Sequence, residues 1–223
     1  MSEATGAPPG AKPRDYWFTV VATDPVALPM VRLLARRRWL SPDAVSVVSL
    51  VLGLAVGPVF ALGTRPALVA GALLFYLAFL FDCIDGKLAR ALDVSSPRGE
   101  AFDHLADGGR RASASLGLAL WLWRAEGPSQ GALWWAVGYA VLAYYFLELS
   151  GAEKGELGGG LGGRWSAALA CRRLLPTPGM PDVQATVFIL GPLTGLVVPA
   201  LALGIAMVLA GIAISVRRRL RTP

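Results

Sequence analysis

The stretch ALVAGALLFYLAFLFDCIDGKLARAL (67–92) decides the fold. Its first part, from Ala67 to Phe81, contains no charged residue, whereas acidic and basic residues alternate with apolar ones in its second part. This pattern is typical of a transmembrane helix that ends near the membrane surface, because charges inside a bilayer are costly. We therefore expect the apolar part to lie in the membrane and the charged part at its boundary.

The composition of the whole chain supports this interpretation. The chain has 223 residues, of which 55% are hydrophobic and 16% are charged, and its mean hydropathy is +0.55. Because soluble domains carry about 25% charged residues, this composition excludes an ordinary soluble enzyme, a disordered chain and a coiled coil. The two distant cysteines, Cys83 and Cys171, exclude a disulfide scaffold. The net charge of +6 does not predict nucleic-acid binding, because the basic residues flank apolar runs.

The apolar runs predict an all-α integral membrane protein with six transmembrane helices. The expected crossings are 44–62, a helix from 67 into the charged motif, 99–123, 132–149 and two within 183–216. The last segment has no charge, and as one helix it would be about 50 Å long, too long for a hydrocarbon core of about 30 Å. Basic residues on both sides place both of its ends in the cytoplasm. We expect it to cross twice, with a break at Pro199 and a kink at Gly191–Pro192.

The chain divides into three regions. Residues 1–23 are expected to form a flexible tail, because they are mostly polar and rich in Pro and Gly. Residues 24–40 mix apolar and arginine side chains, which predicts an amphipathic helix in the headgroup layer. Residues 41–221 are expected to form the six-helix transmembrane catalytic domain. We expect a multi-pass protein of the cell (inner) membrane, with both termini and the active site on the cytoplasmic side.

Four aspartates in two neighbouring helices predict a metal site. Asp82 and Asp85 share a face of the second crossing, while Asp103 and Asp107 are four residues apart and stack on one face of the third. The short link makes these helices antiparallel neighbours, so the carboxylates should converge just inside the cytoplasmic boundary. Divalent cations, Mg²⁺ or Mn²⁺, would neutralise them and take substrate phosphates as further ligands. Two such ions would form the clamp used in phosphoryl displacement.

Gly86 and Ala89 lie on the same helix face as the first aspartate pair. Their small side chains leave a floor on which a pyrophosphate could approach the backbone. One alternative is that the acids form structural ion pairs with nearby cations, namely Lys87, Arg90, Arg110 and Arg111. Another is a small membrane transporter with a charged substrate path, although no internal repeat is evident and the charges lie at one edge of the membrane.

The pattern D-x2-D-G-x2-A-R-x8-G-x3-D-x3-D runs through this region. It is met by Asp82, Asp85, Gly86, Ala89, Arg90, Gly99, Asp103 and Asp107. The pattern resembles the signature of the CDP-alcohol phosphotransferases, also called CDP-alcohol phosphatidyltransferases. The resemblance implies an integral-membrane enzyme, usually a homodimer, that cleaves the pyrophosphate of a CDP-linked donor. Such an enzyme moves the phosphoryl-bearing group, most often from CDP-diacylglycerol, to an alcohol and releases CMP.

The resemblance also implies roles for individual residues. Asp82, Asp85 and Asp103 are expected to bind the metal, and Asp107 to act as the general base and touch the second metal. The expected nucleotide-binding residues are Asp82, Asp85, Gly86, Ala89, Arg90 and Gly99.

Four arginines are candidates for binding the polar acceptor alcohol, namely Arg110, Arg111, Arg172 and Arg173. An acceptor with its own phosphate, such as glycerol phosphate or inositol phosphate, would need such cations. The alternative for Arg172 and Arg173 is that they hold their loop on the anionic leaflet. The sequence does not decide the acceptor, and phosphatidylglycerol, serine and a CDP-linked polyol also remain candidates.

Overall fold

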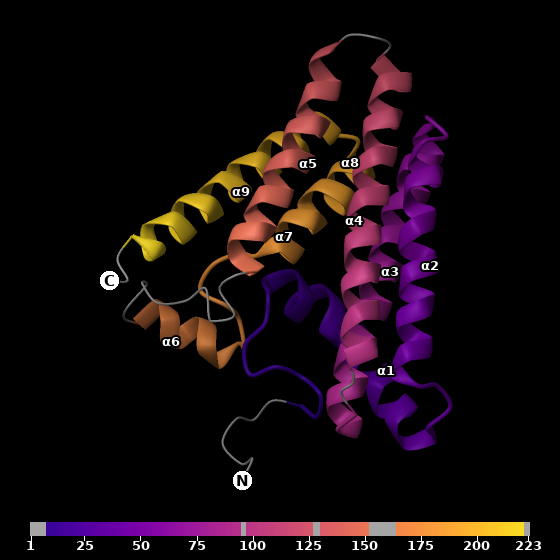
Figure 1. The fold of residues 1–223 in the computed structure, drawn as a ribbon, viewed down its shortest axis with the longest axis vertical. Helices are drawn as coiled ribbons and strands as arrows, with labels where there is room; N and C mark the ends of the chain where they lie inside the picture. The colour runs from indigo at the N-terminus through magenta and orange to yellow at the C-terminus, as the bar shows by residue number, and fades with distance from the viewer. Residues whose placement is uncertain (1–7, 95–96, 127–129, 152–163, 221–223) are drawn as a thin grey trace.

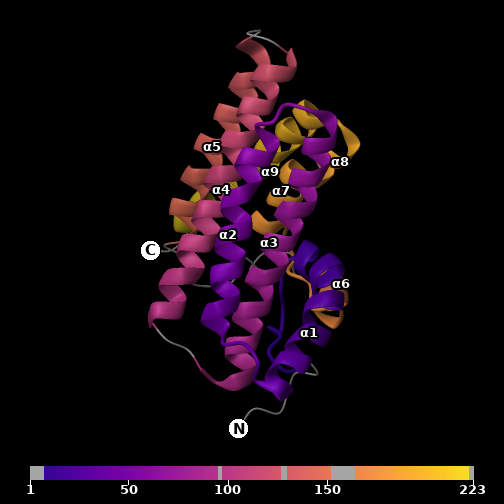
Figure 2. The ribbon, with the colours of Figure 1, turned by 90° about the vertical axis from the view of Figure 1, so that its right-hand side faces the viewer.

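A computed structural model describes residues 8–94, 97–126, 130–151 and 164–220, and the named elements of these residues are all helices. Three long helices lie side by side along the long axis: α2 (Pro42–Phe60), α3 (Arg65–Leu92) and α4 (Pro97–Glu126). Figures 1 and 2 show them as one layer of the bundle, in which α2 packs against both of the others. Because α3 descends and α4 ascends, the charged end of α3 lies beside the acidic beginning of α4.

Side-chain caps determine where α2 and α3 begin. The Ser41 hydroxyl accepts a hydrogen bond from the Ala44 N–H at 3.2 Å, and the Thr64 hydroxyl accepts one from the Ala67 N–H at 3.3 Å. Such caps satisfy backbone donors that have no partner within the helix. The last turn of α3 ends at Asp93, whose φ of 55° is left-handed. The charged motif therefore lies in the final turns of a continuous helix.

Small residues allow α2 and α4 to approach closely. A Cβ atom on Gly117 would overlap the backbone of Gly57, so only glycine fits at this crossing. The Gly57 N–H donates to the Ser113 hydroxyl at 3.0 Å, and that hydroxyl donates to the Leu54 carbonyl at 2.7 Å. This contact fixes α4 along α2.

The uncharged segment near the C-terminus folds back on itself, as expected. It forms α7 (Met180–Ala185), η2 (Thr186–Leu190), α8 (Gly191–Thr194) and α9 (Val197–Arg219), and α9 packs against α5 (Gln130–Gly151). The predicted break at Pro199 is wrong, because the chain reverses at Gly195, where φ is +83°. Pro199 instead lies in the first turn of α9, where proline is tolerated. The Arg65 guanidinium donates to the carbonyls of Pro192 and Leu193 just before the reversal.

Several of these helices have the length and composition of membrane spans. Among the described residues, three meet this criterion, 42–60, 65–92 and 197–217, and a shorter apolar helix covers Leu133–Leu147. A crossing needs about 20 predominantly apolar residues. These helices are those of a membrane protein.

The N-terminal region differs from the predicted loose tail. Residues 1–7 lie outside the described part, but from residue 8 the chain contacts the helical bundle and leads through η1 (Thr19–Thr23) into α1 (Asp24–Arg37). The Trp17 indole N–H donates to the Leu175 carbonyl at 2.7 Å, and the Phe18 N–H donates to Asp182 at 2.6 Å. These bonds hold the segment against the chain that follows α6 (Arg164–Cys171). The tail prediction therefore does not hold for residues 8–23.

Candidate active site

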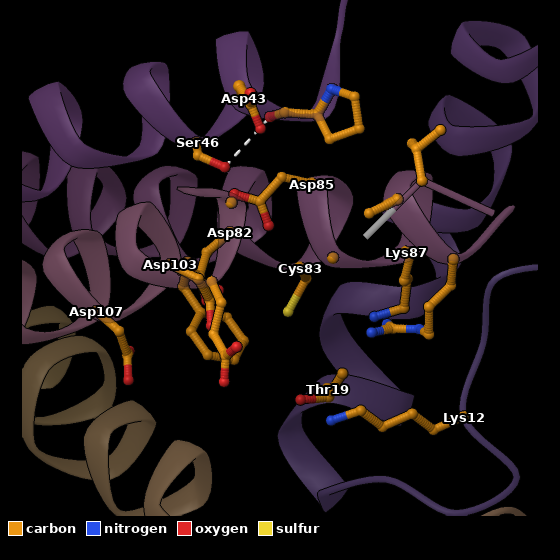
Figure 3. Close-up of a pocket in the computed structure, with 18 of the residues that line it drawn as sticks. Lys12, Thr19, Asp43, Ser46, Asp82, Cys83, Asp85, Lys87, Asp103 and Asp107 are labelled. Carbon is orange, nitrogen blue, oxygen red and sulfur yellow. Dashed lines mark hydrogen bonds between the residues drawn. The ribbon is translucent and has the colours of Figure 1, made fainter. Parts of the chain in front are cut away.

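A cavity of about 870 Å³ lies where the end of α3 faces the beginning of α4 (Figure 3). Its volume is within the range of about 300–1,000 Å³ that small-molecule sites occupy. The final turns of α3 supply the largest share of its lining residues, and α2, α4 and the N-terminal segment supply most of the others. All eight residues of the sequence pattern line it: Asp82, Asp85, Gly86, Ala89, Arg90, Gly99, Asp103 and Asp107.

Three aspartates converge in this cavity. Asp82 and Asp85 from α3 and Asp103 from α4 each offer one carboxylate oxygen, and these oxygens lie within 4.8 Å of one another. Oδ1 of Asp82 and Oδ2 of Asp85 are buried and accept no hydrogen bond from the described residues. The Arg110 guanidinium lies 3.5 Å from the Asp82 oxygen, whereas the Asp85 oxygen has no ion-pair partner among the described residues. A buried carboxylate oxygen without a partner is costly, and oxygen ligands are those that hard divalent cations prefer. The donor set therefore fits a divalent metal ion.

Asp107 lies one turn further along α4 and stands outside this group of three. It lines the same cavity, and Figure 3 shows its side chain directed to the same side as that of Asp103. Its two carboxylate oxygens form ion pairs with different guanidinium groups, Oδ1 with Arg110 and Oδ2 with Arg111. Three of the four predicted aspartates thus come together, and the fourth lies beside them with two cationic partners.

Arg110 connects an aspartate of α3 with an aspartate of α4. Its side chain is completely buried, and its guanidinium carbon lies 5.6 Å from the ring centre of Phe75 and 5.2 Å from that of Phe79. Its Nη1 is 3.5 Å from Oδ1 of Asp82, and the same guanidinium pairs with Asp107. The structural ion pairs that the sequence left as an alternative therefore exist for Arg110 and Arg111, beside the cluster of three acids.

Two of the predicted acceptor-binding arginines, Arg110 and Arg111, pair with Asp107 at the edge of the cavity. None of the four lines the described cavity, and Arg111 instead borders an apolar groove between α4 and α5. Arg172 is exposed. Nη1 of Arg173 pairs with Oδ2 of Asp24 at 3.1 Å, and Nζ of the buried Lys87 pairs with Oδ1 of the same carboxylate at 3.1 Å. Arg173 and Lys87 thus attach the start of α1 to α3 and to the chain after α6.

The sequence interpretation missed four residues of the cavity wall because it assigned them to the loose tail. They are Lys12, Asp15, Tyr16 and Thr19. The neighbouring aromatic residues Tyr16, Trp17 and Phe18 were an available signal, because flexible tails are poor in aromatic residues. Burial, followed by the nearby carboxylates, raises the pKa of Tyr16 above its usual value, so its phenol stays neutral at physiological pH.

The chain is similar to known proteins both in its sequence and in its fold. The family model described as CDP-alcohol phosphatidyltransferase matches residues 39–171. A bifunctional IPC transferase and DIPP synthase from Rubrobacter xylanophilus is 36% identical over 158 residues. That match covers 70% of this chain but 32% of the relative, so the chain spans about a third of the relative's length.

Two solved structures of a phosphatidylinositol phosphate synthase from Mycobacterium tuberculosis share the fold. The one with CDP-DAG bound has a TM-score of 0.58 and 22% identity, and it covers 87% of this chain and 92% of that chain. The one in complex with manganese and citrate has a TM-score of 0.58 and 21% identity, with coverage of 86% and 87%. At this level of identity the likeness concerns the fold.

Proposed function

Because the chain belongs to the CDP-alcohol phosphatidyltransferase family, we propose that it transfers the phosphatidyl group of CDP-diacylglycerol to a polar alcohol and releases CMP. The observation that carries this proposal is the group of three aspartate oxygens within 4.8 Å of one another in a cavity of substrate size. The sequence pattern that resembles the family signature lines that cavity. A CDP-lipid bound to a protein of the same fold adds support for the donor.

We propose that Asp82, Asp85 and Asp103 hold Mg²⁺ or Mn²⁺, with two ions bound during the reaction. The two buried oxygens without hydrogen-bond partners support this assignment. When bound, divalent cations neutralise the pyrophosphate and the negative charge that develops on the leaving CMP. Gly86 and Ala89 leave room along α3 for the nucleotide, and Arg90 and Gly99 complete the nucleotide side of the cavity.

We propose that Asp107 is the general base. The acceptor hydroxyl gives its proton to the Asp107 carboxylate, and its oxygen attacks the phosphorus that carries diacylglycerol. The bond from that phosphorus to the bridging oxygen of CMP breaks, and CMP leaves with the electron pair. Oδ2 of Asp107 is the oxygen suited to this task, because its partner Arg111 is 23% exposed and can withdraw, whereas Arg110 is fixed by burial.

The membrane arrangement that we propose has six crossings, with the α7–α8 run and α9 as the last two. The amphipathic α1 would lie in the headgroup layer of the cell membrane, with the aspartates and both termini on the cytoplasmic side. In this arrangement the lipid donor reaches the cavity from the bilayer while CMP and the alcohol exchange with the cytosol. We also propose that the protein acts as a homodimer, as the family resemblance implies.

The direct test is release of CMP by the purified protein in detergent with CDP-diacylglycerol, Mg²⁺ or Mn²⁺, and a panel of alcohols. We expect CMP release that requires both the cation and one of the alcohols. Asp85→Asn is the matched variant, because it removes the charge of a cluster residue while preserving its shape. CMP release without added cation, or equal rates for wild type and Asp85→Asn, would contradict the proposal.

A further inference from the structure

The N-terminal segment crosses directly over the sequence pattern on α3. Gly10 has φ +80°, and a Cβ atom there would overlap the Lys87 carbonyl, so a side chain could not be accommodated. Nε of Arg90 donates to the Gly10 carbonyl at 3.0 Å. An arginine of the pattern itself thus holds this crossing in place. We call residues 10–15 the N-terminal strap.

A second arginine holds the other part of the strap. Nε and Nη2 of Arg173 donate to the Lys12 carbonyl at 3.3 and 3.0 Å. The Asp15 N–H donates to the Arg173 carbonyl at 2.8 Å, and the Leu175 N–H donates to the Asp15 carbonyl at 3.0 Å. The Lys12 backbone is therefore fixed on both sides. The strap therefore forms part of the cavity wall and is held in place by hydrogen bonds.

This arrangement directs the Lys12 side chain into the cavity. Figure 3 shows Lys12 and Thr19 on the side opposite Asp43 and Ser46, with the acidic cluster beside the space between them. Lys12 thus lines the same cavity as the three aspartates that we propose to hold the metal.

Among the described cations that line the cavity, Lys12 is the one that neither belongs to an ion pair nor donates a hydrogen bond to another described residue. Lys87 is buried in its ion pair with Asp24, and Arg90 is held by the Gly10 carbonyl. No acidic side chain of the described residues lies within ion-pair distance of the Lys12 ammonium. A cation held over an acidic cluster, without an acidic partner of its own, is suited to an anionic group of the substrate.

We propose that Lys12 binds the phosphate of the acceptor, so that the acceptor is a phosphorylated polyol, an inference that rests on the proposed function. Two phosphates could meet this lysine, the pyrophosphate of the donor and a phosphomonoester of the acceptor. The geometry favours the acceptor, because the small residues that admit the nucleotide lie along α3, whereas Lys12 faces the cavity from the separate wall. The hydroxyl groups of Tyr16 and Thr19 on that wall are suited to the hydroxyls of a polyol.

Comparing each phosphorylated acceptor with its parent alcohol shows whether Lys12 binds the phosphate of the acceptor or the pyrophosphate of the donor. CMP release is measured with glycerol 3-phosphate against glycerol and with inositol 1-phosphate against inositol, using wild type, Lys12→Met and Lys12→Arg. We expect Lys12→Met to raise the KM for the preferred phosphorylated acceptor about tenfold or more, the loss typical of one hydrogen bond to a charged group. The KM for CDP-diacylglycerol should stay unchanged, and Lys12→Arg should restore most of the loss.

Arg14→Met is the matched control. Arg14 lies in the same strap, is exposed and does not line the cavity, so its loss should leave every KM unchanged. A rise in the KM for CDP-diacylglycerol with Lys12→Met would assign the lysine to the donor and overturn the proposal. Equal effects on a phosphorylated acceptor and its parent alcohol would also overturn it, as would wild-type preference for the unphosphorylated partner.

A binding measurement keeps this inference separate from the proposed function. Isothermal titration of inositol 1-phosphate and glycerol 3-phosphate is carried out with Mn²⁺ and CMP present, so it does not require turnover. We expect wild type to bind one of these probes and Lys12→Met to bind it about tenfold more weakly. Equal affinities, or no binding of either probe by wild type, would overturn the inference, whereas CMP release with an unphosphorylated alcohol would still support the proposed transferase.

Discussion

The buried ion pair between Lys87 and Asp24 provides a quantitative test of how the N-terminal region is attached. Lys87 Nζ lies 3.1 Å from Asp24 Oδ1, and the side chains are 2% and 5% exposed. Replacing Lys87 with Met removes the positive charge and retains a long apolar side chain. The Asp24 carboxylate then keeps one partner, Arg173, at 3.1 Å.

The magnitude follows from this burial. Breaking a buried ion pair by removing one partner costs about 3–5 kcal/mol, and we expect the lower end, about 3 kcal/mol, because Arg173 still pairs with Asp24. At about 2–4 °C per kcal/mol for a chain of this size, Tm should fall by about 6–12 °C. Replacing both partners, in Lys87→Met/Asp24→Leu, should recover most of the loss, because no buried carboxylate is left without its lysine.

Thermal unfolding of the purified protein in detergent, followed by tryptophan fluorescence, measures this effect. Arg14→Met is the control, because Arg14 is exposed and its replacement should shift Tm little. A Tm of Lys87→Met within 2 °C of wild type would refute the reasoning. So would a double variant that is as unstable as the sum of the two single variants.

Three further changes test other parts of the molecule. Asp107→Asn should lower the turnover number by at least about 100-fold, as expected for loss of a general base. Equilibrium binding of a CDP nucleotide should be largely retained, and an unchanged turnover number would contradict the assignment of Asp107 as the base. Asp82→Asn should raise the Mn²⁺ concentration for half-maximal CMP release about tenfold or more, and an unaltered metal requirement would count against its role as a ligand. Gly117→Ala should lower the free energy of unfolding by about 1–3 kcal/mol through overpacking, because the added Cβ would meet the backbone of Gly57. Gly131 has open space around it, so the control variant Gly131→Ala should not destabilise the protein. Equal Tm values for the two variants would contradict the close packing of α2 and α4.

The helices and the acidic cluster could be predicted from the sequence because both depend on local signals. Apolar runs bounded by caps such as Ser41 determine where the long helices lie, and the spacing of the aspartates places them on facing surfaces. The convergence of Asp82, Asp85 and Asp103 could therefore be predicted from the sequence alone.

The N-terminal wall and the chain reversal could not be predicted because they depend on distant contacts. Arg173 holds Lys12 across 161 residues of sequence, and no local pattern indicates that pairing. Similarly, the choice between Pro199 and Gly195 as the reversal point depends on a left-handed backbone conformation and on carbonyls satisfied by Arg65. The surroundings of Arg110 could not be predicted either, because they depend on the packing of Phe75, Phe79 and the acidic residues around it.

The most direct test of the central claim is whether the purified protein binds Mn²⁺ at a saturable site, measured by electron paramagnetic resonance of the free ion during a titration. Wild type should bind Mn²⁺ at a saturable site, and Asp85→Asn should lose that binding, because its buried carboxylate contributes one of the three converging oxygens. Superimposable titration curves for the two proteins, or no saturable binding by wild type, would contradict the metal-dependent transferase described above.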